Sequence, residues 1–175
     1  MSEKANFSNI YKFYDLINTV LTLGFDKSWR EKAANNLIGY TVLDLGSGTG
    51  AAFDQLINYE TTAIDPDKKM LELNSFQDKV LGSAEDLPFD DNSFEAGAAD
   101  PPYTEEFART LYNCDYPKWS VWTKELVRVV KSGGKIAIMH NYIVPKLTGC
   151  EFTEIFVALN RIKQYPKIVT IQTKL

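Results

Sequence analysis

The stretch VLDLGSGTG, at residues 42–50, constrains the fold of this chain more than any other feature. It begins with the apolar, partly β-branched residues Val42, Leu43 and Leu45, which suit a buried parallel strand. Alternating glycines follow at once, and the next segment, AAFDQLINY, is apolar and compatible with a helix. A strand, closely spaced glycines and a helix allow the backbone to approach a ligand at a helix N-terminus. The pattern therefore predicts a ligand-binding turn, although a strand-to-helix turn without a ligand has the same local form.

The spacing of these glycines separates the turn from the dinucleotide-binding type, which has the form G-x-G-x-x-G. Here the form is D-x-G-x-G-x-G, and it resembles motif I of the class I S-adenosylmethionine (AdoMet) methyltransferases. The resemblance implies AdoMet as the cofactor. The binding residues that it implies in this turn are Asp44, Gly46, Ser47, Gly48 and Gly50.

Segments with strand and helix character alternate along the rest of the chain. We expect strands at 41–45, 61–65, 79–81, 94–99 and 135–140, helices at 51–58, 67–73, 105–112 and 119–130, and a terminal antiparallel pair at 150–159 and 167–173. Two earlier helices, at 7–18 and from 26 or 28 to 37, are expected over the cofactor cleft or on one sheet edge.

This alternation predicts an α/β fold, a doubly wound, mostly parallel sheet with helices on both faces. The resemblance refines the prediction to a seven-stranded, Rossmann-like class I methyltransferase sheet with an antiparallel C-terminal hairpin. At 175 residues the chain suits one domain, with the N-terminal helices in 1–40 and the sheet core in 41–175.

Composition narrows the class of protein further. No apolar run approaches the roughly 18 residues of a membrane span, and the N-terminus lacks the apolar core of a secretory signal, so we expect a cytoplasmic protein without a membrane partner. The two cysteines, Cys114 and Cys150, lie in no metal-ligand spacing and are expected to be reduced thiols. With His140 as the single histidine, no metal site is expected.

The charges are unevenly distributed. Residues 1–115 carry 9 Lys and Arg and 20 Asp and Glu, which gives a net charge of −11. Residues 116–175 carry 10 Lys and Arg and 3 Asp and Glu, which gives +7, and the whole chain therefore has a net charge of −4. Such asymmetry is compatible with a nucleic-acid-facing half, and equally with solvated lysines that happen to cluster.

Further cofactor contacts are expected beyond the glycine turn. Asp65 ends the second predicted strand before Pro66, where a carboxylate can accept both ribose hydroxyls; the alternative is a solvent-facing Asp-Pro turn. The resemblance identifies Asp65 as the motif II acidic residue. It also places Ala84 and Glu85 in the adenine-contacting segment, although Ser83 stands where many relatives have Asp, so that Glu85 or Asp86 would serve instead.

The segment at 14–33, YDLINTVLTLGFDKSWREKA, resembles the ubiquinone/menaquinone-biosynthesis methyltransferase family. This resemblance implies that Tyr14 and Arg30 reach the methionine carboxylate of AdoMet. An arginine suits that role because it binds a carboxylate through two parallel hydrogen bonds. Arg30 can equally be a surface residue of its helix.

The segment ADPPY, at 99–103, resembles motif IV of the methyltransferases that modify exocyclic amino nitrogens, and its DPPY form is typical of adenine N6 enzymes. The resemblance implies a catalytic role for Asp100, Pro101, Pro102 and Tyr103. Hydrogen-bond acceptors on the N–H groups of an amine, here the Asp100 carboxylate and the Pro101 carbonyl, free its lone pair for attack. The two prolines stiffen the turn that carries these acceptors. The ring of Tyr103 can stack on a base. The same tetrapeptide is also common as a turn that ends a strand and has no catalytic role.

The C-terminal third resembles small phage-type DPPY methylases, in which a helix, a Gly-Gly turn, a strand and a terminal hairpin follow the motif. The two resemblances agree on the fold and disagree on the substrate. Giving more weight to DPPY, we expect methyl transfer from AdoMet to an exocyclic amino group of a nucleobase, with DNA or RNA as partner and adenine favoured. The alternatives are a small-molecule methyltransferase acting on a quinone precursor or other metabolite, and a non-catalytic AdoMet-binding subunit. Oligomeric state is left open.

Overall fold

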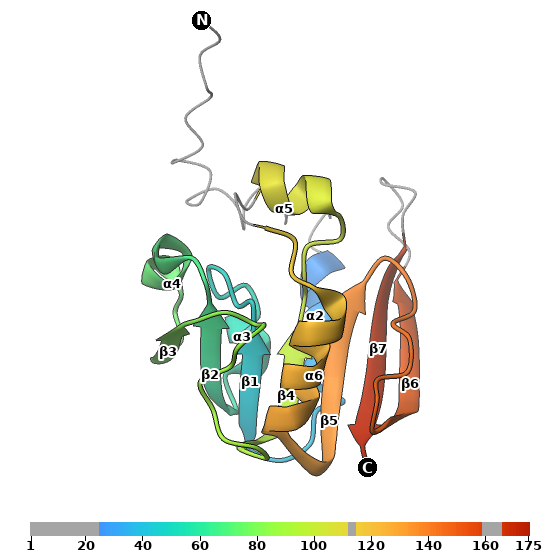
Figure 1. The fold of residues 1–175 in the computed structure, drawn as a ribbon. Coiled ribbons are helices and arrows are strands. Elements are labelled where there is room, and N and C mark those ends of the chain that lie inside the picture. Colours follow the sequence, from blue (N-terminus) through green and yellow to red (C-terminus); the bar gives the residue numbers. More distant parts are fainter. Residues whose placement is uncertain (1–24, 112–114, 159–165) are drawn as a thin grey trace, which may run out of the picture.

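A single sheet organises the part of the chain that the computed structural model describes, residues 25–111, 115–158 and 166–175. Its seven strands within these ranges lie in the order β3-β2-β1-β4-β5-β7-β6 (Figure 1). The elements are α2 Phe25–Ala34, β1 Thr41–Leu45, α3 Phe53–Leu56, β2 Glu60–Asp65, α4 Lys68–Leu73, β3 Asp78–Leu81, β4 Phe94–Ala99, α5 Glu105–Leu111, α6 Trp119–Val129, β5 Val130–His140, β6 Cys150–Ala158 and β7 Lys167–Lys174.

The strand pairing confirms the predicted fold class. Strands β3, β2, β1, β4 and β5 are parallel to one another, and β7 is antiparallel to both β5 and β6. The helices flank this sheet, as in the Rossmann-like methyltransferase fold. The predicted helix at 7–18, together with Tyr14 and Cys114, lies outside the described residues.

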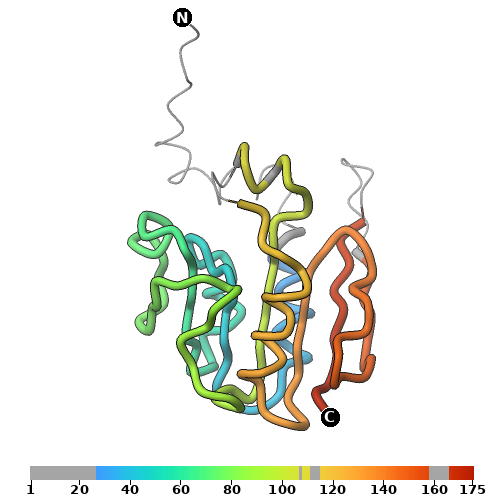
Figure 2. Tube along the Cα trace, in the orientation of Figure 1, coloured from blue at the N-terminus to red at the C-terminus, as the bar shows by residue number. Residues whose placement is uncertain are grey.

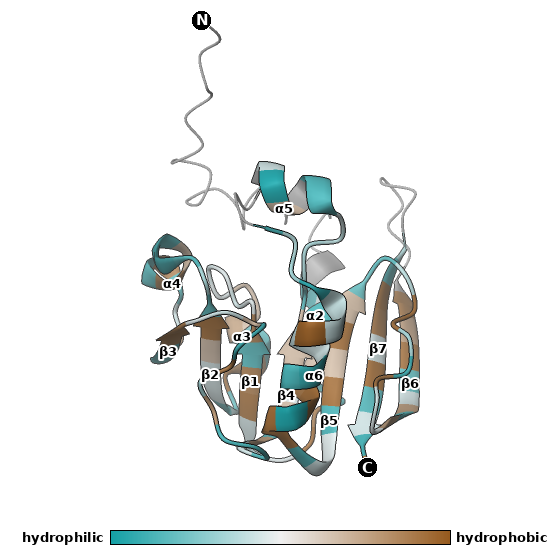
Figure 3. Cartoon of the chain, in the orientation of Figure 1, coloured by the Kyte–Doolittle hydropathy of each residue, from teal (hydrophilic) through white to brown (hydrophobic). Residues whose placement is uncertain are grey.

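Strand alternation divides the hydrophobic core into two layers, one on each face of the sheet. On β5, Ile136 and Ile138 pack in the layer that contains Trp122 and Leu126 of α6. The intervening residues of the same strand pack in the opposite layer with α2 and α3. Figure 1 shows α6 in front of the sheet and α2 behind it, and Figure 3 shows hydrophobic bands along β5 and β7.

The small residues that give β4 a weak strand propensity are explained by how the strand packs. Its sequence, FEAGAA, is rich in small residues, and a Cβ added to Gly97 would lie 2.7 Å from Leu126 Cδ1 and 3.2 Å from Val130 Cγ2. The small residues therefore allow α6 to approach the centre of the sheet. The alternation of elements identified this strand where propensity alone did not.

Most element boundaries differ from the prediction by one to three residues, and the largest differences are at α3 and β5. Helix α3 is only Phe53–Leu56, shorter than the expected 51–58, because residues 49–52 still belong to the glycine turn. Strand β5 begins at Val130, and its register with β4 shifts between Phe94 and Ala96, so the predicted Gly-Gly turn is an irregularity within the strand. Gly133 has a φ of +79° there.

The parallel strands bring the predicted site residues to one edge of the sheet. Leu45, Ala99 and Ile138 are register partners across β1, β4 and β5, so the segments that follow these strands leave the sheet side by side. Helix α5 stands above this carboxyl edge rather than on either face (Figure 2). Ligands bind outside the carboxyl ends of the strands in open α/β sheets.

Candidate active site

The glycine turn after β1 is built by backbone hydrogen bonds to β2. The N–H groups of Gly46 and Ser47 donate to Ile64 O at 2.9 and 3.0 Å. Gly46 and Gly48 have φ values of +70° and +54°, which favour glycine. Within the described ranges, an added Cβ at either position would meet no heavy atom within 4 Å. The turn therefore presents open backbone at the carboxyl edge.

Asp65, at the end of β2, ties the turn to the next loop. Its Oδ2 accepts from Gly48 N at 2.9 Å and its Oδ1 accepts from Asp67 N at 2.8 Å. Burial raises the pKa of Asp65, and these two amide donors oppose the rise. Each oxygen retains a lone pair for a further donor, so the carboxylate can still accept the predicted ribose hydroxyls. Pro66 follows as an exposed residue.

A second support of the turn, Asn74, was not identified from the sequence. Asn74 is buried and its Nδ2 donates to Ser47 Oγ at 3.1 Å and to Gly48 O at 3.0 Å. Its Oδ1 accepts from Phe76 N at 2.9 Å, which fixes the amide orientation. A Cβ added to Gly50 would lie 2.7 Å from that Oδ1. The only signal in the sequence was an asparagine directly after a short helix, which usually marks a helix end.

Asp44 and Arg30 come together on the α2 side of the sheet. Asp44 is buried, and its Oδ2 has no hydrogen-bond partner in the described part of the chain. Burial raises the pKa of Asp44 to about 7, and the positive charge of Arg30 opposes this rise. A hollow at this edge is lined by both residues and by Asp100, which follows β4. The structure thus brings together three predicted site residues from separate elements.

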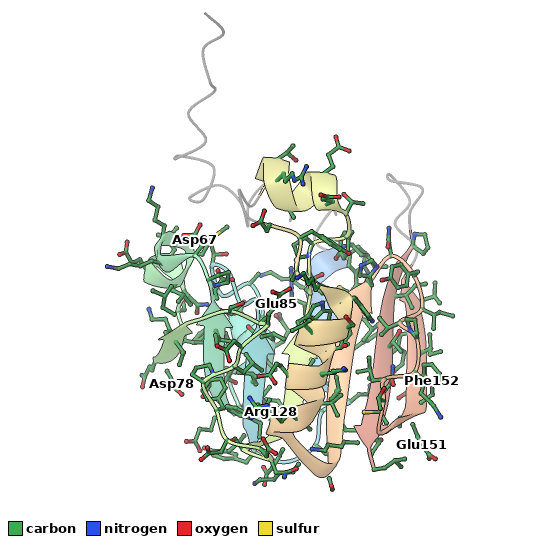
Figure 4. All side chains as sticks on the ribbon, in the orientation of Figure 1. Asp67, Asp78, Glu85, Arg128, Glu151 and Phe152 are labelled. Atoms are coloured by element: carbon green, nitrogen blue, oxygen red, sulfur yellow. The ribbon has the colours of Figure 1, made fainter. Side chains whose placement is uncertain are left out.

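The predicted adenine-contacting segment is a tight loop beside α6. Ser83 Oγ accepts from Glu85 N at 3.1 Å, and Glu85 itself accepts from Lys118 N just before α6 (Figure 4). Ala84 is half-buried against the core layer that contains α6. One Glu85 oxygen is therefore engaged within the protein, and its contact with adenine remains a prediction.

Arg128 of α6 holds the same segment in place and was also not identified from the sequence. Its guanidinium donates to Phe89 O at 2.7 Å and Leu87 O at 3.0 Å, and it forms ion pairs with Asp91 and Glu125 at 2.9 and 2.7 Å (Figure 4). The carboxylates of Glu125 and Asp91 raise the pKa of Arg128. One arginine therefore fixes the whole loop from 87 to 91.

The DPPY turn has a specific internal arrangement. Tyr103 donates its hydroxyl to Asp100 Oδ1 at 2.5 Å, and Lys167 Nζ lies 3.3 Å from the centroid of the Tyr103 ring. Burial lowers the pKa of Lys167, and Asp100 opposes this effect. Pro101 and Pro102 are half-buried between β4 and Tyr103. Lys167 covers the ring of Tyr103, which was expected to stack on a base.

The described residues contain no group of three or more His, Cys, Asp or Glu side chains placed to hold a metal ion. None of the helices described is both long and apolar enough to cross a membrane.

Comparison with known proteins decides the family. A family model described as a methyltransferase domain matches residues 43–138, which include the glycine turn, Asp65 and the DPPY turn. This chain belongs to that methyltransferase domain family. Family membership implies AdoMet as the methyl donor and confirms the expected class of enzyme, an AdoMet-dependent methyltransferase.

Several curated relatives are quinone-biosynthesis enzymes. A demethylmenaquinone methyltransferase from Corynebacterium glutamicum is 34% identical over 140 residues, covering 75% of this chain and 56% of the relative. A ubiquinone/menaquinone biosynthesis C-methyltransferase from Rickettsia bellii is 29% identical, covering 94% of this chain and 70% of the relative. The chain spans about half the length of the first of these relatives.

Solved structures agree on the fold. A Haloferax volcanii protein described as a methyltransferase, solved with a methyltransferase activator, has a TM-score of 0.68 at 15% identity and covers 99% of both chains. A Thermotoga maritima AdoMet-dependent methyltransferase has a TM-score of 0.67 at 17% identity, covering 94% of this chain and 97% of the other. At these identities the likeness concerns the fold alone.

The relatives overturn the expected acceptor. The predicted nucleobase amine, with DNA or RNA as partner, is wrong, because the relatives named above are methyltransferases of quinone biosynthesis. The finding supports the alternative, a small-molecule acceptor. The DPPY tetrapeptide is a strand-ending turn that does not by itself identify the acceptor, and the covered ring of Tyr103 agrees with this correction.

Proposed function

We propose that this chain transfers a methyl group from AdoMet to a ring carbon of a small aromatic hydroquinone. The observation that carries the proposal is 34% identity to a demethylmenaquinone methyltransferase over three quarters of the chain. The name of the Rickettsia relative, a C-methyltransferase, supports carbon rather than oxygen as the methylated atom.

The residues at the carboxyl edge fit AdoMet, which supplies a methyl group bound to a positively charged sulfur. The open backbone at Gly46 and Gly48 allows close approach, as a nucleoside-bearing ligand requires. Asp44 offers a buried carboxyl oxygen that has no hydrogen-bond partner among the described residues, which suits the ammonium group or sulfonium of the ligand. Arg30 of α2, which lines the same hollow, suits the carboxylate of the ligand.

The acceptor side is proposed to lie over the DPPY turn. Asp100 lines the same hollow as Asp44, and its strand, β4, is the neighbour of β1. Its bond from Tyr103 and the restricted φ of Pro101 and Pro102 hold the turn in one conformation. Holding donor and acceptor in fixed positions supplies much of the rate enhancement in a displacement of this kind.

A methyl-acceptor screen tests this function. The protein is incubated with tritiated AdoMet and, in parallel, with reduced 1,4-dihydroxynaphthalene, a benzohydroquinone, duplex DNA or total RNA. Calorimetry measures AdoMet binding separately. We expect label in the organic extract with a hydroquinone and none in nucleic acid. AdoMet binding without label in any hydroquinone would overturn the proposed acceptor while leaving the cofactor site intact.

A further inference from the structure

His140, the last residue of β5, carries a buried polar side chain that forms no hydrogen bond with the described residues. Its exposed fraction is 0%. Among the described residues, neither Nδ1 nor Nε2 has a hydrogen-bond partner. A buried polar group left without a partner costs about 1–3 kcal/mol, so such groups require an explanation. One explanation is that the imidazole takes part in the reaction.

Three aromatic rings surround the imidazole, and together with it they form what we call the aromatic cluster. The ring centroid of His140 lies 3.9 Å from that of Tyr142, 5.1 Å from that of Tyr103 and 6.2 Å from that of Trp119. Tyr142 is 42% exposed, and the other two are half-buried. The imidazole thus lies directly beneath side chains that reach the surface.

The position of the cluster connects it to the acceptor side of the site. Ala99 and Ile138 are register partners, so Asp100 and His140 follow neighbouring strands at the same edge. Asp100 lines the hollow on the α2 side and accepts the hydroxyl hydrogen of Tyr103, whose ring contacts the imidazole. His140 therefore lies one side chain away from a residue of the proposed cofactor hollow.

We propose that His140 is the general base of the reaction and accepts the proton of the acceptor's aromatic hydroxyl. This role rests on the proposed function. The acceptor reaches a ring nitrogen of His140 when the side chain of Tyr142 rotates away, and the remaining rings of the aromatic cluster then pack against the acceptor ring.

The step balances as follows. The O–H bond breaks, its proton binds the imidazole nitrogen, and the electron pair left on oxygen is delocalised onto a ring carbon. That carbon forms a bond to the methyl carbon as the methyl–sulfur bond breaks, and its electron pair stays on sulfur. The ring carbon then loses its hydrogen to water as a proton, and the imidazolium returns its own proton to the oxygen. One proton is released for each methyl group transferred.

The charges around His140 are consistent with a base. Burial lowers the pKa of His140, so the ring is neutral and able to accept a proton near neutral pH. Asp100 opposes this shift, and so does Asn141, although the Asn141 side chain does not complete a hydrogen bond to either ring nitrogen. The other titratable groups nearby are Tyr103, Tyr142, whose pKa is raised by burial, and Lys167 on the face of Tyr103.

The first test uses the fact that His140 is the only histidine in the 175 residues. In tag-free protein labelled with carbon-13 in the histidine ring, a single resonance reports its pKa. We expect a pKa below the ordinary value of about 6.5 and a resonance that shifts when reduced 1,4-dihydroxynaphthalene is added. A resonance that does not shift when the hydroquinone is added contradicts the proposal.

The second test compares the wild type with His140→Gln and His140→Phe. We expect kcat to fall by about 100-fold or more, the acidic limb of the pH profile to disappear, and AdoMet affinity to stay within about threefold. His140→Phe keeps a ring in place and removes the unpaired nitrogens, so its melting temperature should equal or exceed that of the wild type. A structural role predicts a lower melting temperature instead.

The outcomes separate this proposal from the proposed function. If the wild type methylates a hydroquinone and His140→Phe does so equally well, the role of His140 is wrong and the function stands. If the wild type methylates no hydroquinone but the histidine resonance responds to one, the function is wrong and the hydroxyl-binding role of His140 stands. If neither occurs, both are wrong.

Discussion

At the scale of single residues, Asp65 is a predicted cofactor residue whose carboxylate is held in place by two backbone amides. We expect Asp65→Ala to weaken AdoMet binding by about 10- to 100-fold, since it removes the bond to Gly48 N and the predicted ribose acceptor together. Asp67→Ala is the matched control: it removes the side-chain cap of α4 but keeps the amide that donates to Asp65. Calorimetry measures both, and equal losses of affinity would show that Asp65 acts only through the loop.

The ionisation of Asp44 gives a prediction about stability. Burial raises its pKa to about 7 in the folded state, whereas the unfolded value is about 3.9. Between these values the folded state holds a proton that the unfolded state has lost. The stability that Asp44 contributes is therefore complete below about pH 4 and is lost as the pH rises to about 7.

Asp44→Asn removes this titration. The free energy of unfolding of the wild type, relative to that of Asp44→Asn, should fall by an amount on the order of 3 kcal/mol between about pH 4 and pH 8. Urea denaturation without AdoMet measures it. Parallel pH curves for the two proteins would contradict a buried, protonated Asp44.

Glycine at position 50 is required for two reasons that a matched pair can separate. Gly50 and Gly133 have similar φ values, +84° and +79°, so alanine at either position costs about 1–2 kcal/mol of backbone strain. Only Gly50→Ala also places a Cβ against the fixed amide of Asn74, while Gly133 faces open space within the described chain. We expect Gly50→Ala to destabilise the protein more than Gly133→Ala in urea denaturation. Equal losses would contradict the contact with Asn74.

These positions also show how far the sequence predicts the site. Asp44 was predicted from the motif I glycine pattern, Asp100 from the DPPY turn and Asp65 because it ends a recognisable strand. The parallel sheet brings all three to one edge. Asn74 was missed because its role depends on the burial of an amide against a loop 26 residues away in sequence. No local pattern marks a contact of that range.

At the scale of elements, Arg128 joins α6 to the loop from 87 to 91. We expect Arg128→Ala to lower the free energy of unfolding by about 2–3 kcal/mol. It leaves the carbonyl oxygens of Leu87 and Phe89 without their side-chain donor and Glu125 without its positive partner. Arg109→Ala is the control, since Arg109 pairs only with Glu105 on the exposed surface of α5 among the contacts described, and should cost no more than about 0.5 kcal/mol. Similar losses in urea denaturation would mean that the loop is held mainly by Leu87 and its apolar contacts.

The order and type of the elements in the sheet could be predicted because strands and helices alternate in the sequence. Their lengths were less predictable. Helix α3 is shortened by the glycine turn, and β5 extends back to Val130 through an irregular pairing with β4. Both differences depend on which backbone groups find partners in the assembled sheet.

At the scale of the whole molecule, the two core layers fill both faces of the sheet, and we propose that donor and acceptor meet at its carboxyl edge. The sequence predicted this edge and its cofactor, but not the acceptor. The DPPY motif identifies the turn that follows β4 but not the acceptor. The side chains that surround the turn are Lys167 from β7, His140 from β5 and Trp119 from α6, and we propose that they select the acceptor. These neighbours come from distant parts of the sequence.

The most direct test of the central claim is the position of the transferred methyl group. Reduced 1,4-dihydroxynaphthalene is incubated with the protein and AdoMet carrying a carbon-13 methyl group, and the extracted product is identified by NMR and mass spectrometry. We predict a single labelled methyl group on a ring carbon with the wild type, and its loss with His140→Phe. A methyl group on oxygen, or label found in nucleic acid and in no hydroquinone, would contradict the account.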